Sequence, residues 1–101
     1  MSTDGYTVLL NPKAVEDIQT AIDFYEGEKV GLGVEFEQEL NDFIITLSRL
    51  PHFEIRYEQF RCLPLKRFPF MIHFTVDKGD KVVFVHAVLH TSLSPNQWKK
   101  H

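Results

Sequence analysis

Cationic and imidazole side chains gather in the second half of this chain. The candidates for chemistry among them are Arg61, Lys66, Arg67, His73, His86 and His90. Cleaving RNA without a metal ion requires a group that activates the 2′-hydroxyl, cations that stabilise the charged phosphorane, and an acid for the leaving oxygen. Arginine, lysine and histidine can supply these functions. If the chain cleaves RNA, its candidate catalytic residues are Arg61, Lys66, Arg67 and His90.

The histidines and the one cysteine do not form a metal-binding pattern. His86 and His90 on one strand would lie about 13 Å apart, because a strand rises about 3.3 Å per residue. His73 and His86 would be cross-strand neighbours, but no third ligand type accompanies them. Cys62 lacks the second thiol that a disulfide or a zinc motif needs, and is expected to pack within a strand. We therefore expect no metal and no cofactor.

The length and hydropathy of the chain predict one soluble domain. Its 101 residues match a single core, so we expect one domain over residues 1–101. No stretch approaches the roughly 20 apolar residues of a membrane-spanning helix. Residues 1–5 lack the basic and apolar regions of a signal peptide. These features predict a cytoplasmic protein without a membrane partner.

Charge is divided unequally along the chain. The net charge is −3, but residues 1–54 hold eleven acidic and three basic side chains, whereas residues 55–101 hold three acidic and eight basic ones. The first part is therefore −8 and the second +5. The second part could meet a polyanion or an acidic partner. Alternatively, an acidic helical layer simply lies beside strands with basic edges.

Apolar spacing in the first half predicts a strand and two helices. A strand is expected over residues 6–10, followed by a helix with Asn11 as N-cap, Pro12 in the first turn and Gly27 as the left-handed end. A second helix is expected over residues 31–50, because Pro51 forbids continuation. The acidic residues off the apolar stripes are expected to be solvated; they are Glu16, Asp17, Asp23, Glu26, Glu35, Glu37, Glu39 and Asp42.

Strand patterns fill the second half. They cover residues 54–57, 60–63, 70–76 and 82–90, and the last two form a hairpin around Gly79. The simplest register places His73 opposite Phe84 and Ile72 opposite Val85. The same register places Arg67 opposite His90, provided that pairing survives past Pro69.

This register predicts a sheet with two different faces. The apolar face, expected to meet the helices, carries Phe70, Ile72, Phe74, Val76, Val83, Val85, Ala87 and Leu89. The mixed face, expected to be open, carries Met71, His73, Thr75, Phe84, His86, Val88 and His90. The fold class is therefore α+β, with a strand, an antiparallel two-helix hairpin and then antiparallel strands that form one twisted sheet with both helices on one face.

Four segments resemble the RelE/ParE superfamily of bacterial type II toxin-antitoxin toxins. They are Asn11-Pro12 with Ala14, Asp17 and Ile18; FYEGEKVGLGVEFEQEL over residues 24–40; RCLPLKRFPFMIHFTV over 61–76; and VHAVLHTSLSPNQWKK over 85–100. Together they span nearly the whole chain. The Gly-Leu-Gly at 31–33 and the His-Thr-Ser ending with Trp98 look more like the ParE branch.

The resemblance implies a toxin that a cognate antitoxin holds inactive, as a monomer, a homodimer or a hetero-oligomer with that antitoxin. ParE-type members poison DNA gyrase by binding, and RelE-type members cut messenger RNA on the ribosome. Residues expected to bind the partner are Arg61, Arg67, His73, His86 and Trp98. Relatives often have an arginine where this chain has Leu93, which weakens the ribonuclease alternative and leaves open a non-toxic homologue that only binds antitoxin.

Overall fold

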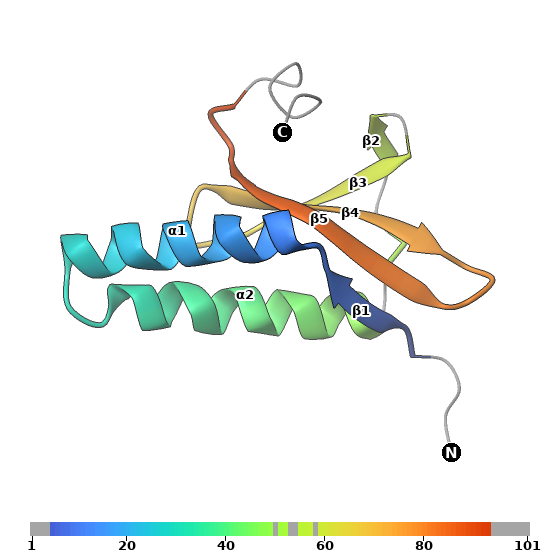
Figure 1. Ribbon diagram of the computed structural model, residues 1–101, viewed down its shortest axis with the longest axis horizontal. Helices are drawn as coiled ribbons and strands as arrows, with labels where there is room; N and C mark the ends of the chain where they lie inside the picture. The colour runs from blue at the N-terminus through green and yellow to red at the C-terminus, as the bar shows by residue number, and fades with distance from the viewer. Residues whose placement is uncertain (1–4, 50, 53–54, 58, 94–101) are drawn as a thin grey trace.

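A computed structural model describes residues 5–49, 51–52, 55–57 and 59–93. It contains two helices and five strands in the predicted order (Figure 1). The elements are β1 (Thr7–Leu10), α1 (Pro12–Glu28), α2 (Leu32–Arg49), β2 (Ile55–Tyr57), β3 (Phe60–Pro64), β4 (Phe70–Asp77) and β5 (Val82–His90). The predicted α+β class is confirmed, and the expected boundaries agree with the structure to within two residues wherever both ends are described.

The N-terminus of α1 is capped as predicted, whereas its C-terminus is not. Asn11 is the N-cap, and its side chain accepts a hydrogen bond of 2.9 Å from the Lys13 N–H. The predicted end at Gly27 is wrong, because α1 continues through Glu28 and the Lys29 N–H bonds the Tyr25 carbonyl. Gly31, at φ 90°, is the left-handed residue instead, since the chain must reverse there to start α2.

The five strands form one mixed sheet in the order β1-β5-β4-β3-β2. The pairs β2/β3, β3/β4 and β4/β5 are antiparallel, whereas β1 lies parallel to β5. Both helices lie against one face of this sheet (Figure 1). The core between the layers joins residues of both helices to alternating strand residues, namely Ala14, Ala21, Phe36, Leu40, Leu47, Leu63, Ile72, Phe74, Val83, Val85 and Val88.

The predicted register of the β4/β5 hairpin is wrong. Phe74, rather than Ile72, lies opposite Val85, and Thr75, rather than His73, lies opposite Phe84. The hairpin turn is therefore centred one residue later in the chain than expected. The ladder also shifts between His73 and Phe74, because β5 carries one extra residue there.

That β-bulge exchanges the two faces over the last part of β5. Val88 lies in the core, and His90 pairs with Phe70 on the helix side, so their predicted place on the mixed face is wrong. Ala87 and Leu89 pair with His73 and Met71 on the opposite side, so their predicted contact with the helices is wrong too. The physical reason is that side chains alternate along a strand, and one inserted residue reverses the alternation beyond it.

The two helices approach closely at Gly33. A Cβ atom at this position would lie 2.8 Å from the Ile22 carbonyl oxygen of α1. Gly27, near the end of α1, has no atom within 4 Å of the same hypothetical Cβ. The two helical glycines therefore have different roles, because only Gly33 is required by packing.

We expect Gly33→Ala to lower the free energy of unfolding by about 1–3 kcal/mol, because the helices must separate to admit the methyl group. Gly27→Ala is the matched control and should raise it by about 0.5–1 kcal/mol through helix propensity. Urea denaturation followed by circular dichroism measures both. Equal effects of the two substitutions would contradict this role for Gly33.

Candidate functional site

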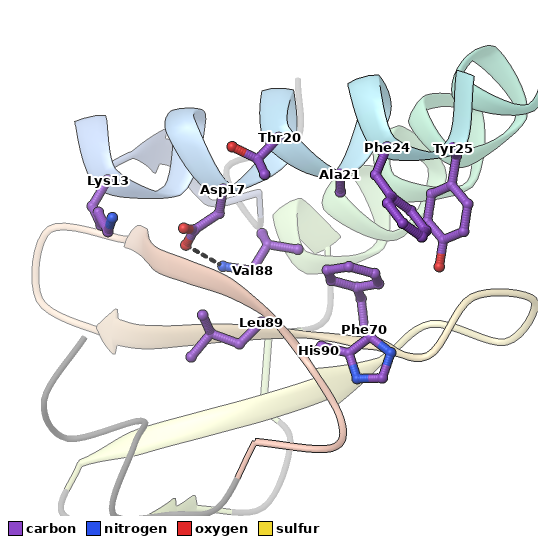
Figure 2. A pocket seen from close by; sticks show the side chains of 10 residues that line it. All are labelled: Lys13, Asp17, Thr20, Ala21, Phe24, Tyr25, Phe70, Val88, Leu89 and His90. Carbon is purple, nitrogen blue, oxygen red and sulfur yellow. Dashed lines mark hydrogen bonds between the residues drawn. The ribbon is translucent and has the colours of Figure 1, made fainter. Parts of the chain in front are cut away.

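A groove lies between α1 and the adjoining ends of β4 and β5 (Figure 2). Its volume is about 490 Å³. The lining combines an apolar floor with polar groups at the rim; its residues are Lys13, Asp17, Thr20, Ala21, Phe24, Tyr25, Phe70, Val88, Leu89 and His90. Because Phe24 is 59% exposed, the groove presents an aromatic ring to solvent.

Aromatic rings form the inner wall of this groove. Tyr25 contacts Phe70 and stacks against Phe36, with ring centroids 6.1 Å and 5.5 Å apart. Phe68 packs on both Tyr25 and Phe36. Partial burial raises the pKa of the Tyr25 hydroxyl above its ordinary value. Tyr25 and Phe36 therefore lie between the helices and the sheet.

His90 stands at the mouth of the groove. Its ring meets Phe70 edge-on at 5.2 Å, and its Nδ1 atom accepts a hydrogen bond of 3.0 Å from the Ser92 N–H. In the neutral imidazole this leaves the proton on Nε2, which can donate to a ligand. The exposed side chain is thus oriented as a hydrogen-bond donor.

Asp17 joins α1 to the edge of β5. Its carboxylate accepts a hydrogen bond of 3.1 Å from the Val88 N–H, which Figure 2 shows as a dashed line. The expectation that Asp17 is merely solvated is therefore wrong, because the backbone donor of an edge strand needs an acceptor. Nothing in the helical spacing distinguishes Asp17 from its solvated neighbours, since its partner is 71 residues away.

Lys66 and Arg67 lie in the loop between β3 and β4, which is held against α2. The Glu39 carboxylate accepts hydrogen bonds from the backbone N–H groups of Lys66 (2.7 Å) and Arg67 (2.9 Å). The Arg67 guanidinium forms an ion pair with Glu35. The conditional pairing of Arg67 with His90 is therefore wrong, since Phe70 lies opposite His90 and the loop turns away at Pro69.

His73 lies on the face opposite the helices, but that face is not open at its centre. His73 is 1% exposed, and its Nδ1 lies 3.4 Å from the Cys62 sulfur. Cys62, Met71, Ala87 and Leu89 around it are also buried. The prediction that His73 belongs to an exposed surface is wrong, because these apolar neighbours exclude water from its ring.

His86 occupies the same face near the hairpin turn. Its Nε2 atom lies 2.8 Å from the Thr75 hydroxyl, and its ring meets Phe60 edge-on at 5.0 Å. Partial burial lowers the pKa of His86 below its ordinary value. Phe84 beside it is 40% exposed, so this end of the face is accessible.

The structure distributes the candidate residues over several surfaces. Arg61 lies half-buried on β3 opposite Phe74, Arg67 lies beside α2, and His90 lies at the groove. Trp98 lies outside the described residues. Leu93, the position where relatives often have arginine, is half-buried. The groove itself was not expected, because the register assigned Val88 and His90 to the wrong face.

The described part of the chain holds neither a metal-binding cluster nor a membrane-spanning helix. Among those residues, no group of three or more His, Cys, Asp or Glu side chains lies close enough to hold a metal ion. Neither described helix is long and apolar enough to cross a membrane.

Removing the Glu39 carboxylate should release the loop over residues 65–69. We expect Glu39→Ala to lower the free energy of unfolding by about 1–2 kcal/mol, because two N–H groups lose a charged acceptor. Hydrogen exchange should accelerate at the amides of Lys66 and Arg67. Glu37→Ala, an exposed neighbour on α2, should change stability by less than about 0.5 kcal/mol. Unchanged exchange in Glu39→Ala would contradict this anchoring role.

His86 should make the protein less stable in mild acid. Because burial lowers its pKa in the folded state, the unfolded chain binds more protons as the pH falls through the ordinary histidine range, and unfolding becomes easier. Urea midpoints between pH 7.5 and 5 should therefore fall more for the unmodified protein than for His86→Gln. Parallel pH profiles would show that His86 does not contribute.

No protein-family model matches the chain, and no curated protein matches it. Similar solved structures exist. A chain of the chromosomal ParDE toxin-antitoxin system from P. aeruginosa superposes with a TM-score of 0.74 at 18% identity, over 89% of this chain and 100% of that one. The RelBE2 toxin-antitoxin complex from Mycobacterium tuberculosis gives a TM-score of 0.64 at 19% identity, over 88% and 94%.

The isolated E. coli RelE toxin gives a TM-score of 0.55 at 12% identity, over 94% of each chain. These identities are low, so the likeness rests on the arrangement of the helices and strands. It covers nearly the whole of both chains, and it agrees with the four sequence segments that resemble the same toxins. The chain therefore shares the fold of the isolated E. coli RelE toxin and of the chains in the two toxin-antitoxin structures.

Proposed function

We propose that this chain is the toxin of a type II toxin-antitoxin pair, that a cognate antitoxin neutralises it, and that it acts in the manner of ParE by binding DNA gyrase in the cytoplasm. The observation that carries the proposal is the superposition on the ParDE chain, which spans 100% of that chain. Neither a metal nor a cofactor enters this mode of action.

The placement of the candidate catalytic residues favours binding over RNA cleavage. General acid-base catalysis needs its groups within hydrogen-bond reach of one reacting centre. Arg67 is engaged by Glu35 on α2, whereas His90 is oriented by Ser92 beside the groove. Cleavage by this set would require the Arg67 guanidinium to leave Glu35. A toxin that acts by surface recognition has no such requirement.

A RelE-like, ribosome-dependent ribonuclease is the second candidate. The likeness to the isolated E. coli RelE toxin and the exposure of Lys66 and Arg67 favour it. Under this alternative Arg61, Lys66, Arg67 and His90 are the residues to test. A third candidate is a non-toxic homologue, for which Leu93 is the motivating feature, since it offers no charge to a phosphate.

Induced expression with two molecular readouts distinguishes the three candidates. The ParE-like function predicts growth arrest, filamentous cells and loss of supercoiling by purified gyrase, with messenger RNA intact. Cuts at translated codons that disappear in Arg61→Ala/Arg67→Ala would replace it with the ribonuclease. Normal growth with both readouts unchanged would favour the non-toxic homologue. Co-expression of the neighbouring small gene should restore growth and yield a co-purifying complex.

A further inference from the structure

One edge of the sheet ends in a short apolar strand. β1 is the last strand on its side of the sheet, beside β5 (Figure 1). Its sequence, Thr-Val-Leu-Leu, holds neither a charged residue nor a proline, which are features that prevent edge strands from pairing with another chain. β2, at the opposite edge, contains Arg56 and pairs irregularly with β3. Of the two edges, β1 is therefore the less protected.

Two residues of β1 direct their backbone groups away from the sheet. The N–H groups of Thr7 and Asn11 bond carbonyls of β5 and the turn before it, both at 2.9 Å. Because backbone groups alternate along a strand, those of Val8 and Leu10 point outward. The N–H of Tyr6, just before the strand, bonds a carbonyl near the end of α2 at 2.7 Å. The stretch that offers outward groups to a further strand is therefore residues 8–10.

Exposed apolar side chains surround this stretch on both faces of the sheet. Leu9 pairs with Phe84 of β5 on the face opposite the helices. On the helix side, Leu10 and Val15 line a second groove of about 200 Å³, whose other walls are α1 and α2. The four side chains are each 40–49% exposed. An apolar strip therefore crosses the edge from one face of the sheet to the other.

A second copy of the chain is complementary to this strip. If two β1 strands pair antiparallel about a two-fold axis at Leu9, Val8 of each copy lies opposite Leu10 of the other. Such opposed residues exchange both backbone hydrogen bonds, so every outward group of residues 8 and 10 is satisfied. The two Leu9 side chains then meet directly across the axis, and the two Phe84 rings flank them.

Charge is compatible with this association. β1 contains no charged residue, so the axis brings no like charges together. The same register places Pro12, at the start of α1, opposite Tyr6 of the second copy. The exposed Glu16 of α1 is then on the same rim as Lys81 of that copy, whose ammonium group lies over the Tyr6 ring. Opposite charges therefore occur together at both rims of the interface.

The available area corresponds to a small interface. A dimer of standard size buries about 10% of a small protein's surface on each copy, or about 640 Å² of the 6405 Å² here. The exposed parts of Leu9, Leu10, Val15 and Phe84 supply roughly 300 Å² on each copy, and the strand backbone and the groove between the helices add to it. We therefore expect a weak dimer, with a Kd on the order of 10–100 μM.

We propose that the β1 edge is a self-association site, at which two copies of this chain pair their β1 strands antiparallel about Leu9 and join their sheets into one. The helices of both copies then cover the same face of the joined sheet. This site does not depend on whether the chain acts on gyrase or on RNA.

Engineered cysteines test the register. Leu9→Cys should give a disulfide-linked dimer under mild oxidation, because Cβ atoms directly opposite in an antiparallel pair lie about 4.5–5.5 Å apart. Thr7→Cys is the matched control, since it is exposed on the same face of the same strand. The two Thr7 positions would lie about 13 Å apart along the strands and should not link. Cys62 is buried and should stay reduced in both variants.

Measurements on the full chain test the dimer without a cross-link. In sedimentation equilibrium the average mass should rise with concentration from 11.8 kDa toward twice that value. Leu9→Lys places like charges across the axis and should weaken the dimer about tenfold or more. Val34→Lys, at an exposed apolar position of α2, should change its Kd by less than about threefold. The amides of Val8 and Leu10 should become more protected from hydrogen exchange as the concentration rises.

Three results would overturn the proposal: a chain that stays monomeric at about 1 mM, equal linking of the two cysteine variants, or equal effects of the two lysine substitutions. Protection of Val8 and Leu10 that requires the co-expressed neighbouring protein, whatever the chain's own concentration, would also overturn it and assign the edge to that protein. None of these measurements reads toxicity, so failure here is distinguishable from failure of the proposed function.

Discussion

One extra residue in β5 decides which side chains of the last strand meet the helices. The bulge beside His73 and Phe74 reverses the alternation, so Val88 enters the core and His90 turns toward α1. The same reversal places Ala87 and Leu89 beside the buried His73 on the far face. The groove under α1 and the hydrogen-bonding pattern of the β5 edge are both consequences of this insertion.

Carboxylates on the helices hold the second half of the chain in place. Asp17 bonds the β5 backbone, Glu39 bonds the backbone of the loop before β4, and Glu35 pairs with Arg67. Glu26 acts within the helical layer, where it accepts hydrogen bonds from the Gly31 and Gly33 N–H groups at the start of α2. Of these contacts, the pair between Glu35 and Arg67 joins opposite charges of the two halves, and the other carboxylates bind backbone N–H groups.

These internal contacts limit which side chains a binding partner can reach. Arg67 is available to a phosphate only if it leaves Glu35, and His73 is screened from solvent. Two accessible aromatic features remain. One is the aromatic groove, with His90 at its mouth, and the other is the half-exposed cluster of Phe84 and His86 near the hairpin turn. Such surfaces suit the recognition of another macromolecule, in which buried aromatic contacts carry much of the binding energy.

Local chemistry in the sequence determined the elements of this protein. Neighbouring residues carry the apolar repeats of helices (3.6 residues) and of strands (2 residues), together with the Asn11-Pro12 cap and the stop at Pro51. These signals predicted both helices, all five strands and the α+β class correctly. The tertiary structure alone decided the bulge, the parallel addition of β1 and the partners of Asp17, Glu35 and Glu39. Each of these joins segments far apart in the chain, where a slip of one or two residues leaves every local pattern intact but changes which side chains meet.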